Sequence, residues 1–388
     1  MIKIYPVVRN RILRCYMRLY DFIAALMVSS GEDKKVDIKR ILLRNPAAMG
    51  DTWYTLRLAN AIKKKNPDME IGMLVGSWSA DMVRECADVS YVHVEDHPIM
   101  NRRRISIWKK MCQWYKTRRQ ALRELKAIGY DAAIDCYYYY PSCAYLFYQA
   151  GVSCRVGYDS REGNCFYTKL IHWDIFDIHN VEYQAELVKS LSLDIDDLTL
   201  SSVNFNHCDC LSDEKIYIDK EYIVIAVGTG EPIREWKREK WASLIDRIYT
   251  YNYTIYLVGA GCREKELIDY LTTRKRPNII SLCNLLSVPQ LSEVIKNAKL
   301  FIGLESFAGH IAATYKIPQI SIMHGSTNKY HWQPYSNDNC YVIRKKLPCN
   351  TCYYPSVCAY NNACMDISVD EVIKAVDDLL KKDSEDCM

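Results

Sequence analysis

A carboxylate, a hydroxyl and a histidine follow one another where an apolar run of the sequence ends. In LFIGLESFAGHIAA, positions 300–313, the run stops at Glu305 and Ser306, and His310 lies four residues beyond Ser306. This order predicts a buried strand that turns into a helix, whose first-turn N–H groups lack intrahelical acceptors and favour an anion. A diphosphate fits there, but the charge of Glu305 would repel it. If the site binds a nucleotide sugar, Glu305 should therefore face sugar hydroxyls. The structural alternative is a Glu-Ser helix cap with a satisfied core histidine.

A second carboxylate follows an earlier strand-like run. In RNPAAMGDTWYTL, positions 44–56, a turn containing Gly50 leads to Asp51 and Thr52 at the start of a helix. Asp is among the best helix caps, so a purely structural role is the first alternative. A carboxylate at the carboxyl end of a parallel strand could also act as a general base. Asp51 is therefore the candidate catalytic residue.

Two further turns could contact a nucleotide. The glycine-flanked turn in VGTGEPIREW, positions 227–236, could bring backbone N–H groups close to a phosphate. Arg234 could neutralise that phosphate, and Glu264, after the next strand, could accept hydrogen bonds from a ribose or a base. The alternatives are a solvated basic turn and an ordinary surface carboxylate. The turn consists of Gly228, Thr229 and Gly230.

Cysteine is abundant, with 17 residues in the chain. Four of them form a C-x2-C-x5-C-x5-C pattern near the end of the chain. The first pair has metal-ligand spacing, but the second pair lacks the short knuckle of common zinc ribbons. A structural zinc clip, a disulfide and reduced thiols all remain open. The four residues are Cys349, Cys352, Cys358 and Cys364.

The composition is that of an ordinary globular protein. The chain has 388 residues, 49% hydrophobic and 25% charged, and this length favours two domains. The net charge of +4 is small, which argues against a nucleic-acid partner. No apolar run approaches the length of about 18 residues that a membrane-spanning helix requires. Since no secretory signal is evident, we expect a cytoplasmic protein with reduced thiols.

The N-terminal residues 7–29 predict one amphipathic, basic helix. Such a helix could lie on an anionic membrane, at the inner face of the cell membrane. The alternative is a terminal helix that packs on its own domain and leaves its arginines in water. The apolar face consists of Val8, Ile12, Tyr16, Leu19, Ile23 and Leu26, and the opposite face carries Arg11, Arg14 and Arg18.

Strand and helix signals alternate along the rest of the chain, which predicts an α/β fold with two parallel sheets. Two such halves imply Rossmann-like domains that face a cleft, with ligand at the carboxyl ends of the strands. We expect strands at 41–45, 71–76, 131–137, 153–158, 222–227, 254–259, 278–282, 300–304 and 319–323. Helices are expected at 51–65, 106–128, 142–150, 179–193, 238–250, 263–274, 288–297, 307–315 and after a Ser368–Glu371 capping box.

The expected domain organisation has six parts. They are the basic helix (1–35), an N-terminal Rossmann-like domain (36–195), a linker (196–215), a C-terminal Rossmann-like domain (216–345), the Cys-rich segment (346–366) and a C-terminal helix (367–388).

In combination and order, these motifs resemble glycosyltransferase family 9, the ADP-heptose:lipopolysaccharide heptosyltransferases. The resemblance spans about residues 40–380, and its most specific parts are MGDTWYTL and LSEVIKNAKLFIGLESFAGHIAATYKIPQISIMHGST. It implies the GT-B fold and an inverting transfer of a sugar, such as heptose, from a nucleotide-diphosphate donor. It also implies that the N-terminal domain takes the acceptor and the C-terminal domain takes the nucleotide sugar. By resemblance the donor is ADP-heptose, no metal cofactor is required, and the acceptor is a lipid-linked saccharide of lipopolysaccharide or another cell-surface glycan.

The resemblance also assigns roles to residues. Asp51 matches the base, with Gly50 and Thr52 beside it on the acceptor side. The donor turn includes Phe307, where the family usually has glycine, and Glu305, where it usually has aspartate. Other readings are a non-catalytic nucleotide-sugar binder with a degenerate site and a nucleotide-sugar 2-epimerase of the same fold. The donor turn comprises Glu305, Ser306, Phe307, Ala308, Gly309 and His310.

Overall fold

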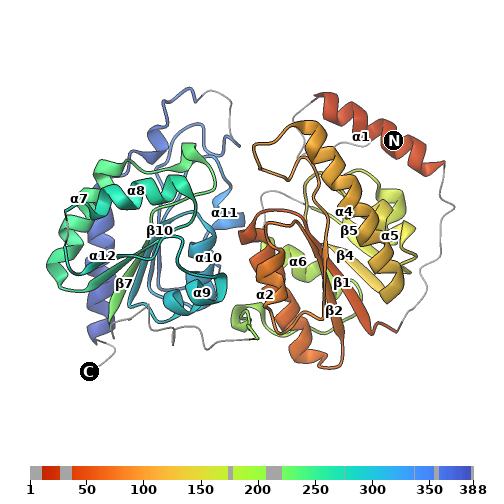
Figure 1. The fold of residues 1–388 in the computed structure, drawn as a ribbon, viewed down its shortest axis with the longest axis horizontal. Coiled ribbons are helices and arrows are strands. Elements are labelled where there is room, and N and C mark those ends of the chain that lie inside the picture. The colour runs from red at the N-terminus through yellow and green to blue at the C-terminus, as the bar shows by residue number, and fades with distance from the viewer. Residues whose placement is uncertain are drawn as a thin grey trace. The chain divides into compact units, whose positions relative to one another are not determined.

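The computed structural model describes residues 11–26, 37–173, 178–206, 221–274, 276–335, 337–353 and 358–385. The chain divides into two compact units, Met1–Asn206 (unit 1) and His207–Met388 (unit 2) (Figure 1). Residues 196–206, expected to open the linker, pack on unit 1, where the Asn206 N–H donates to the Glu85 carbonyl at 2.8 Å. Residues 207–215 of the expected linker lie outside the described residues.

Unit 1 contains a six-stranded parallel sheet in the order β3-β2-β1-β4-β5-β6. Within the described residues its strands are β1 (Arg40–Asn45), β2 (Glu70–Val75), β3 (Tyr91–Val94), β4 (Ala132–Asp135), β5 (Cys154–Tyr158) and β6 (Lys169–Ile171). Its α-helices are α1 (Arg11–Ala25), α2 (Met49–Lys65), α3 (Ala80–Arg84), α4 (Ile107–Ile128), α5 (Ala144–Gln149) and α6 (Asn180–Lys189). Short 3-10 helices are η1 (Asn164–Phe166) and η2 (Leu198–Leu200).

Unit 2 contains a second six-stranded parallel sheet, in the order β12-β11-β10-β7-β8-β9. Its strands are β7 (Tyr222–Ala226), β8 (Thr254–Val258), β9 (Ile279–Ser281), β10 (Leu300–Leu304), β11 (Gln319–Ile322) and β12 (Cys340–Ile343). Its α-helices are α7 (Arg238–Ile248), α8 (Cys262–Thr272), α9 (Val288–Lys296), α10 (Phe307–Thr314), α11 (Lys329–Trp332) and α12 (Val369–Glu385). The 3-10 helices are η3 (Pro232–Arg234), η4 (Tyr249–Tyr251) and η5 (Ala363–Met365).

The two parallel sheets confirm the predicted α/β fold, and every strand expected from an apolar run is present within two residues at each end. Three strands had no prediction: β3, β6 and β12. All three are outermost strands, and β6 and β12 contain no fully buried residue. A strand with one open edge and half-buried side chains carries no continuous apolar run, which is why the sequence pattern does not reveal it.

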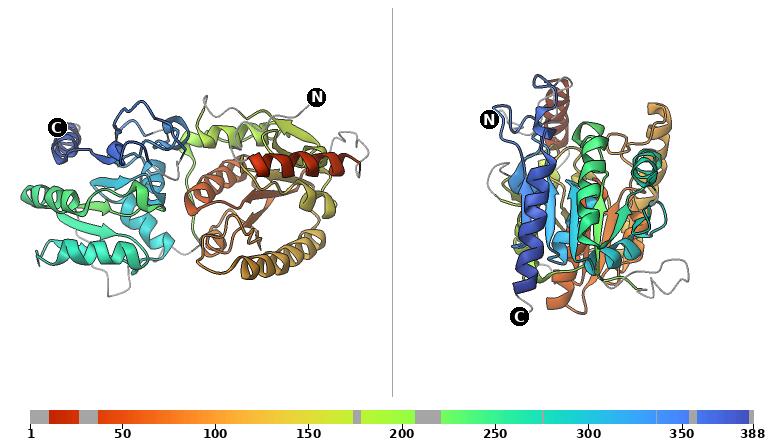
Figure 2. Two further views of the ribbon diagram at one scale, coloured as in Figure 1. Left: turned by 90° about the horizontal axis from the view of Figure 1, so that it is seen from above. Right: turned by 90° about the vertical axis from the view of Figure 1, so that its left-hand side faces the viewer.

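The helices are held by apolar cores on the sheets. In unit 1, α4 and α5 contribute Leu125 and Phe147 to a core that contains Leu42 of β1. In unit 2, α7, α8 and α12 join the sheet in one core. Helix α12 lies beside α7 (Figures 1 and 2) and begins with the predicted capping box, in which the Glu371 N–H donates to Ser368 Oγ at 3.2 Å and the Ser368 N–H donates to Glu371 Oε2 at 2.8 Å.

Helix α1 confirms the central part of the predicted N-terminal helix. The helix does not, however, pack on unit 1 through its predicted apolar face. Met17 and Ala24 are buried against unit 1, and the Asp21 carboxylate accepts the Gly163 N–H at 2.6 Å. The predicted apolar face is instead exposed at every described position: Tyr16, Leu19, Ile23 and Leu26. Residues 7–10 and 27–29 lie outside the described part of the chain. Among the described residues, no helix is long and apolar enough to cross a membrane.

A buried ion network fixes the carboxyl ends of the strands of unit 1. Asp135, at the end of β4, is fully buried and accepts from Arg44 of β1 at 3.0 Å. Arg161 lies 2.8 Å from the other oxygen of the same carboxylate, which also accepts from the Tyr167 hydroxyl at 2.9 Å. Burial disfavours the ionised form, but Arg161 and Arg44 outweigh it, and the pKa of Asp135 is lowered.

A matched pair of variants tests this network. Replacing Asp135 with Asn should destabilise unit 1 by about 3–5 kcal/mol, because two buried guanidinium groups lose the counter-charge that they share. The control is Asp131→Asn, at the other end of the same strand, whose half-exposed carboxylate accepts the Lys39 and Arg40 N–H groups at 2.9 and 2.8 Å. Hydrogen exchange of the β1 and β4 amides measures the loss of stability. Equal amide protection in the two variants would contradict the predicted role of Asp135.

The lowered pKa fixes the sign of the pH dependence. Because the folded state holds the Asp135 proton less tightly than the unfolded chain, the network stabilises the fold above the ordinary aspartate pKa of about 3.9. That stabilisation is lost as the pH falls through the lower pKa of the folded state. Asp135→Asn should therefore reduce the acid-induced loss of amide protection.

Candidate functional site

Asp51 lies in the first turn of α2, six residues beyond the end of β1 at Asn45. The helix begins at Met49 with Ala48 as its N-cap, so Asp51 is the third helical residue and not the cap. Asn45, the last residue of β1, donates from Nδ2 to the Asp51 carbonyl at 3.1 Å and to Thr55 Oγ1 at 2.9 Å. The turn is therefore tied to the strand end, and Asp51 itself is partly exposed.

The two residues expected beside Asp51 are both part of the helix. Gly50 is its second residue, and Thr52 is fully buried with its hydroxyl donating to the Ala48 carbonyl at 3.3 Å. The charge of Asp51 acts on Tyr137, which follows β4. Burial raises the pKa of the Tyr137 phenol, and the negative charge of Asp51 raises it further.

Aromatic side chains extend from this point along the carboxyl edge of the sheet of unit 1. Tyr137 is 5.6 Å from Tyr138 between ring centroids, and Tyr138 stacks on Trp173 at 4.0 Å with an interplanar angle of 6°. Trp173 in turn lies 4.0 Å from Tyr183. The sequence pattern did not single out these rings, because YYYY at 137–140 carries no apolar period.

In unit 2, Glu305 forms the centre of a compact polar cluster. Its Oε1 accepts from Arg234 Nη1 at 3.0 Å, and its Oε2 accepts from the Thr327 hydroxyl at 2.6 Å. The Thr229 hydroxyl donates to the Glu305 carbonyl at 3.3 Å. The side chain is buried, with 8% of the residue exposed. The structure thus brings together three residues predicted for the donor site and adds Thr327, which was not predicted.

The charge of Glu305 is balanced by cations that are close to it. Burial raises the pKa of Glu305, while Arg234, the hydrogen bond from Thr327 and Arg344 act in the opposite direction. Arg344, which follows β12, donates to the carbonyls of Gly325 and Thr327 at 3.0 and 2.8 Å and so fixes the loop that carries Thr327. Arg344 was not predicted, since it lies beyond an edge strand that the pattern does not show.

The start of α10 has the properties of an anion site. Ser306 is the N-cap residue but makes no side-chain cap bond, and its buried Oγ has no hydrogen-bond partner among the residues that the structure describes. The helix itself is regular from its first turn, where the His310 N–H donates to the Ser306 carbonyl at 3.3 Å. The Glu-Ser side-chain cap considered from the sequence is therefore absent among the described residues. The helix dipole favours an anion at this end of α10.

The remaining residues of the donor turn differ in exposure. Phe307 is the first residue of α10 and is partly exposed, whereas Ala308 and Gly309 are buried. His310 is buried too, with its ring centroid 6.1 Å from that of Trp332. The Gly309 carbonyl accepts from Gln319 Nε2 at 3.1 Å, which ties α10 to β11.

The glycine turn after β7 lies against Glu264. A Cβ atom on Gly228 would come within 2.0 Å of Glu264 Cδ, so only glycine leaves room for that carboxylate. Glu264 Oε2 accepts the Ala260 N–H at 2.8 Å, and burial raises the pKa of Glu264. The Thr229 carbonyl accepts from Arg263 Nη2 at 2.5 Å. Since β7 and β10 are neighbours in the sheet, these turns share one edge with Glu305.

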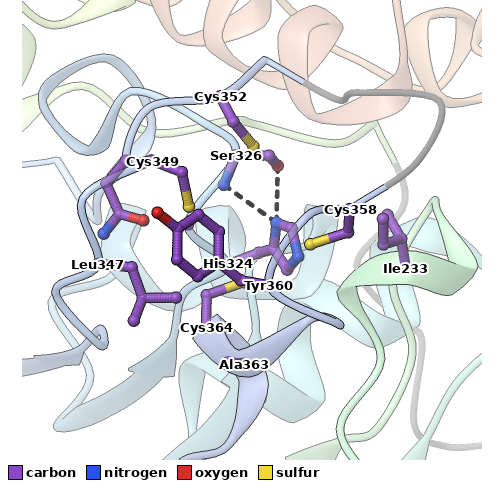
Figure 3. Close-up of a pocket in the computed structure, with 12 residues that line it drawn as sticks. Ile233, His324, Ser326, Leu347, Cys349, Cys352, Cys358, Tyr360, Ala363 and Cys364 are labelled. Atoms are coloured by element: carbon purple, nitrogen blue, oxygen red, sulfur yellow. Dashed lines mark hydrogen bonds between the residues drawn. The ribbon is translucent and has the colours of Figure 1, made fainter.

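The Cys-rich segment supports this edge. The thiols of Cys349, Cys352, Cys358 and Cys364 lie around His324 in one pocket (Figure 3). Asn362 joins two parts of the site, because its Oδ1 contacts His324 Nε2 at 2.7 Å and its Nδ2 donates to the Ile233 carbonyl at 2.7 Å, next to Arg234. Within the described residues, no three His, Cys, Asp or Glu side chains are arranged to hold a metal ion.

Comparison with known proteins shows similarity along most of the chain. The family model of glycosyltransferase family 9 (heptosyltransferase) matches residues 118–357. Lipopolysaccharide heptosyltransferase 3 of Escherichia coli is 28% identical over 126 residues, 31% of this chain and 36% of that protein, so this match spans about a third of the relative's length. Its counterpart in strain K12 is 22% identical over 299 residues, 74% of this chain and 83% of that protein.

Solved structures agree with this family in fold. A family 9 glycosyltransferase from Veillonella parvula superposes with a TM-score of 0.70 at 17% identity, covering 90% of this chain and 99% of that chain. The E. coli heptosyltransferase WaaC, solved with ADP, has a TM-score of 0.67 at 20% identity and covers 88% of this chain and 99% of that chain. The predicted GT-B fold is confirmed. Because the family model matches more than half of its residues, the chain belongs to glycosyltransferase family 9, the heptosyltransferase family.

Proposed function

We propose that this protein transfers a heptose from ADP-heptose to a lipid-linked saccharide of lipopolysaccharide, with inversion at the anomeric carbon. The observation that carries the proposal is the start of α10, where an uncapped helix end lies beside the Glu305–Arg234 pair. The dipole of a helix favours negative charge at its N-terminus, so this end of α10 suits a diphosphate. The solved relative WaaC was obtained with ADP and with an ADP-heptose analogue, which supports the choice of donor.

In this proposal unit 2 holds the diphosphate through its backbone and one guanidinium group. The first turn of α10 and the Gly228–Gly230 turn donate N–H groups to the phosphate oxygens, with Ser306 Oγ beside them. The carboxylate of Glu305 would repel a phosphate if it stood alone. Its pairing with Arg234 at 3.0 Å neutralises it and orients the guanidinium, whose other N–H groups serve the phosphate.

Asp51 supplies the base on the acceptor side. Its carboxylate takes the proton of an acceptor hydroxyl while that oxygen forms a bond to the anomeric carbon. The bond from this carbon to the diphosphate oxygen breaks, and the electron pair leaves with ADP. The anomeric carbon passes through an oxocarbenium-like state, as in glycoside hydrolysis, and the charge on the leaving diphosphate is stabilised by fixed donors. No metal takes part in this scheme.

The acceptor side of the proposal also involves α1. A lipid-linked acceptor lies at a membrane surface, and α1 presents Leu19, Phe22 and Leu26 to solvent, with 59, 65 and 76% of each residue exposed. Such a face on a basic helix suits the headgroup region of an anionic bilayer. We therefore propose a cytoplasmic enzyme that acts peripherally at the inner face of the cell membrane.

Replacing Asp51 with Asn should lower the rate of heptose transfer by a factor of about 10²–10⁴, the usual contribution of a general base. ADP binding, measured by calorimetry, should stay unchanged. The control is Glu182→Gln, because Glu182 also lies in the third position of a helix, α6, in the same unit. The two variants lose the same interaction with a helix dipole, so equal turnover in both would exclude Asp51 as the base and favour a non-catalytic binder.

Replacing Arg234 with Gln should weaken ADP binding by a factor of about 10 to 100, since a charge-assisted hydrogen bond contributes about 1.5–3 kcal/mol. The change also leaves the buried Glu305 without its cation. Lys237→Gln is the control, because Lys237 is exposed in the same loop and the charge change is identical. If both variants bind ADP equally well, Arg234 does not contact the diphosphate.

Replacing Glu305 with Gln separates two roles of this residue. From the sequence it is expected on sugar hydroxyls, but both of its oxygens have protein partners in the structure. We therefore expect equal weakening of ADP and ADP-heptose binding, through the loss of a fixed Arg234. A larger loss for ADP-heptose than for ADP would contradict this role and assign Glu305 to the sugar.

A further inference from the structure

The segment from 102 to 123 is the most basic part of the sequence. It contains nine lysines and arginines and no aspartate or glutamate, whereas acidic residues outnumber basic residues in the rest of the chain. The net charge of this segment is therefore positive, whereas the net charge of the rest of the chain is negative. The nine residues are Arg102, Arg103, Arg104, Lys109, Lys110, Lys116, Arg118, Arg119 and Arg123.

Large apolar side chains of the same segment point to solvent. Trp108 is 78% exposed, Tyr115 is 62% exposed and Ile107 is 61% exposed, with Met111 among the exposed residues as well. These residues lie in the first turns of α4, away from the buried Ala121 and Leu125 that attach the helix to unit 1. The core of unit 1 therefore does not require this apolar surface.

The basic residues divide into two groups. Arg118 pairs with the buried Glu95 at 2.6 Å, and Lys110 donates to the Asn101 carbonyl at 2.6 Å, so both support the fold. Lys109 and Lys116 are exposed beside the aromatic residues, and Arg119 stacks 5.5 Å from the centroid of Tyr115. Arg103 and Arg104 are exposed just before the helix. The cations that surround the apolar residues are thus directed to solvent.

We propose that this surface, the first turns of α4 with Arg103 and Arg104, docks on an anionic lipid bilayer. Tryptophan and tyrosine favour the interface between hydrocarbon and headgroups, and the aliphatic side chains can enter the acyl boundary. Lysine and arginine beside them attract anionic headgroups. A nucleic acid would match the charge alone and would leave Ile107 and Met111 without an apolar partner, so the combination fits a bilayer.

The surface is separate from the exposed face of α1 but belongs to the same unit. A chain of rings connects the two helices: Tyr16 of α1 lies 6.4 Å from Tyr140, Tyr140 lies 5.9 Å from His97, and His97 lies 5.2 Å from Trp114 of α4. Unit 1, proposed above to take the acceptor, thus presents two apolar surfaces that its own core leaves exposed.

Vesicle sedimentation tests the α4 surface. The wild-type chain should bind vesicles made of equal parts of phosphatidylglycerol and phosphatidylethanolamine, and should bind phosphatidylcholine vesicles more weakly. Lys109→Gln with Lys116→Gln should weaken binding to the anionic vesicles by about thirtyfold, since each basic residue near the surface contributes about 1 kcal/mol. Trp108→Ala should weaken binding to both kinds of vesicle. Sodium chloride should reduce binding of the wild type to anionic vesicles only.

Matched variants and a competing partner complete the test. Lys346→Gln with Lys374→Gln removes two exposed charges from unit 2, and Leu285→Ala removes an exposed apolar side chain there. Vesicle binding that falls equally in these controls, or that survives the α4 changes, would overturn the proposal. Tighter binding to duplex DNA than to vesicles, lost in the same α4 variants, would assign the surface to nucleic acid instead. Because the test needs neither donor nor acceptor, its failure leaves the proposed transfer unaffected.

Discussion

The polar edge of unit 2 depends on one buried carboxylate. Burial at 8% exposure disfavours the ionised form of Glu305, and Arg234 and Thr327, which each occupy one of its oxygens, stabilise that form. Each partner is itself held: Arg344 fixes the loop of Thr327, and Asn362 fixes the backbone beside Arg234. The Cys-rich segment, which contains Asn362, therefore stabilises this edge through hydrogen bonds that do not depend on metal binding.

Unit 1 also stabilises a buried carboxylate at the end of a strand, but with different residues. One buried carboxylate of unit 1, Asp135, also ends a central strand and also pairs with guanidinium groups, those of Arg44 and Arg161. In both units the charges lie at the carboxyl ends of parallel strands, where the strands stop and the loops begin. A rigid strand end beside a variable loop is the general location of ligand sites in parallel sheets. Asp51 and the start of α10 both occupy such a position.

The sequence predicted most of the fold because central parallel strands are buried on both faces and so form continuous apolar runs. It also placed Asp51 and Glu305 in the segments that follow two of these strands, because a carboxylate in the turn after an apolar run can be recognised from the sequence alone. Their roles in transfer stay predictions. Thr327 and Arg344 were missed, because their role exists only where β10, β11 and β12 lie side by side. The apolar face of α1 was found correctly, but a period of 3.6 residues cannot tell a face that packs on the domain from one that stays exposed.

Phe307 is the clearest departure from the family pattern, and its position explains how the chain accommodates it. As the first residue of α10 it lies outside the buried part of the helix, and the following turn is closed normally by the His310 N–H. Both hydrogen bonds to the side chain of Glu305 are formed with the phenyl group in place. The substitution therefore leaves the backbone donors of the turn intact and adds an apolar side chain beside them. We therefore expect Phe307 to restrict which shapes of sugar nucleotide fit the site, without weakening the interactions that bind the charged diphosphate.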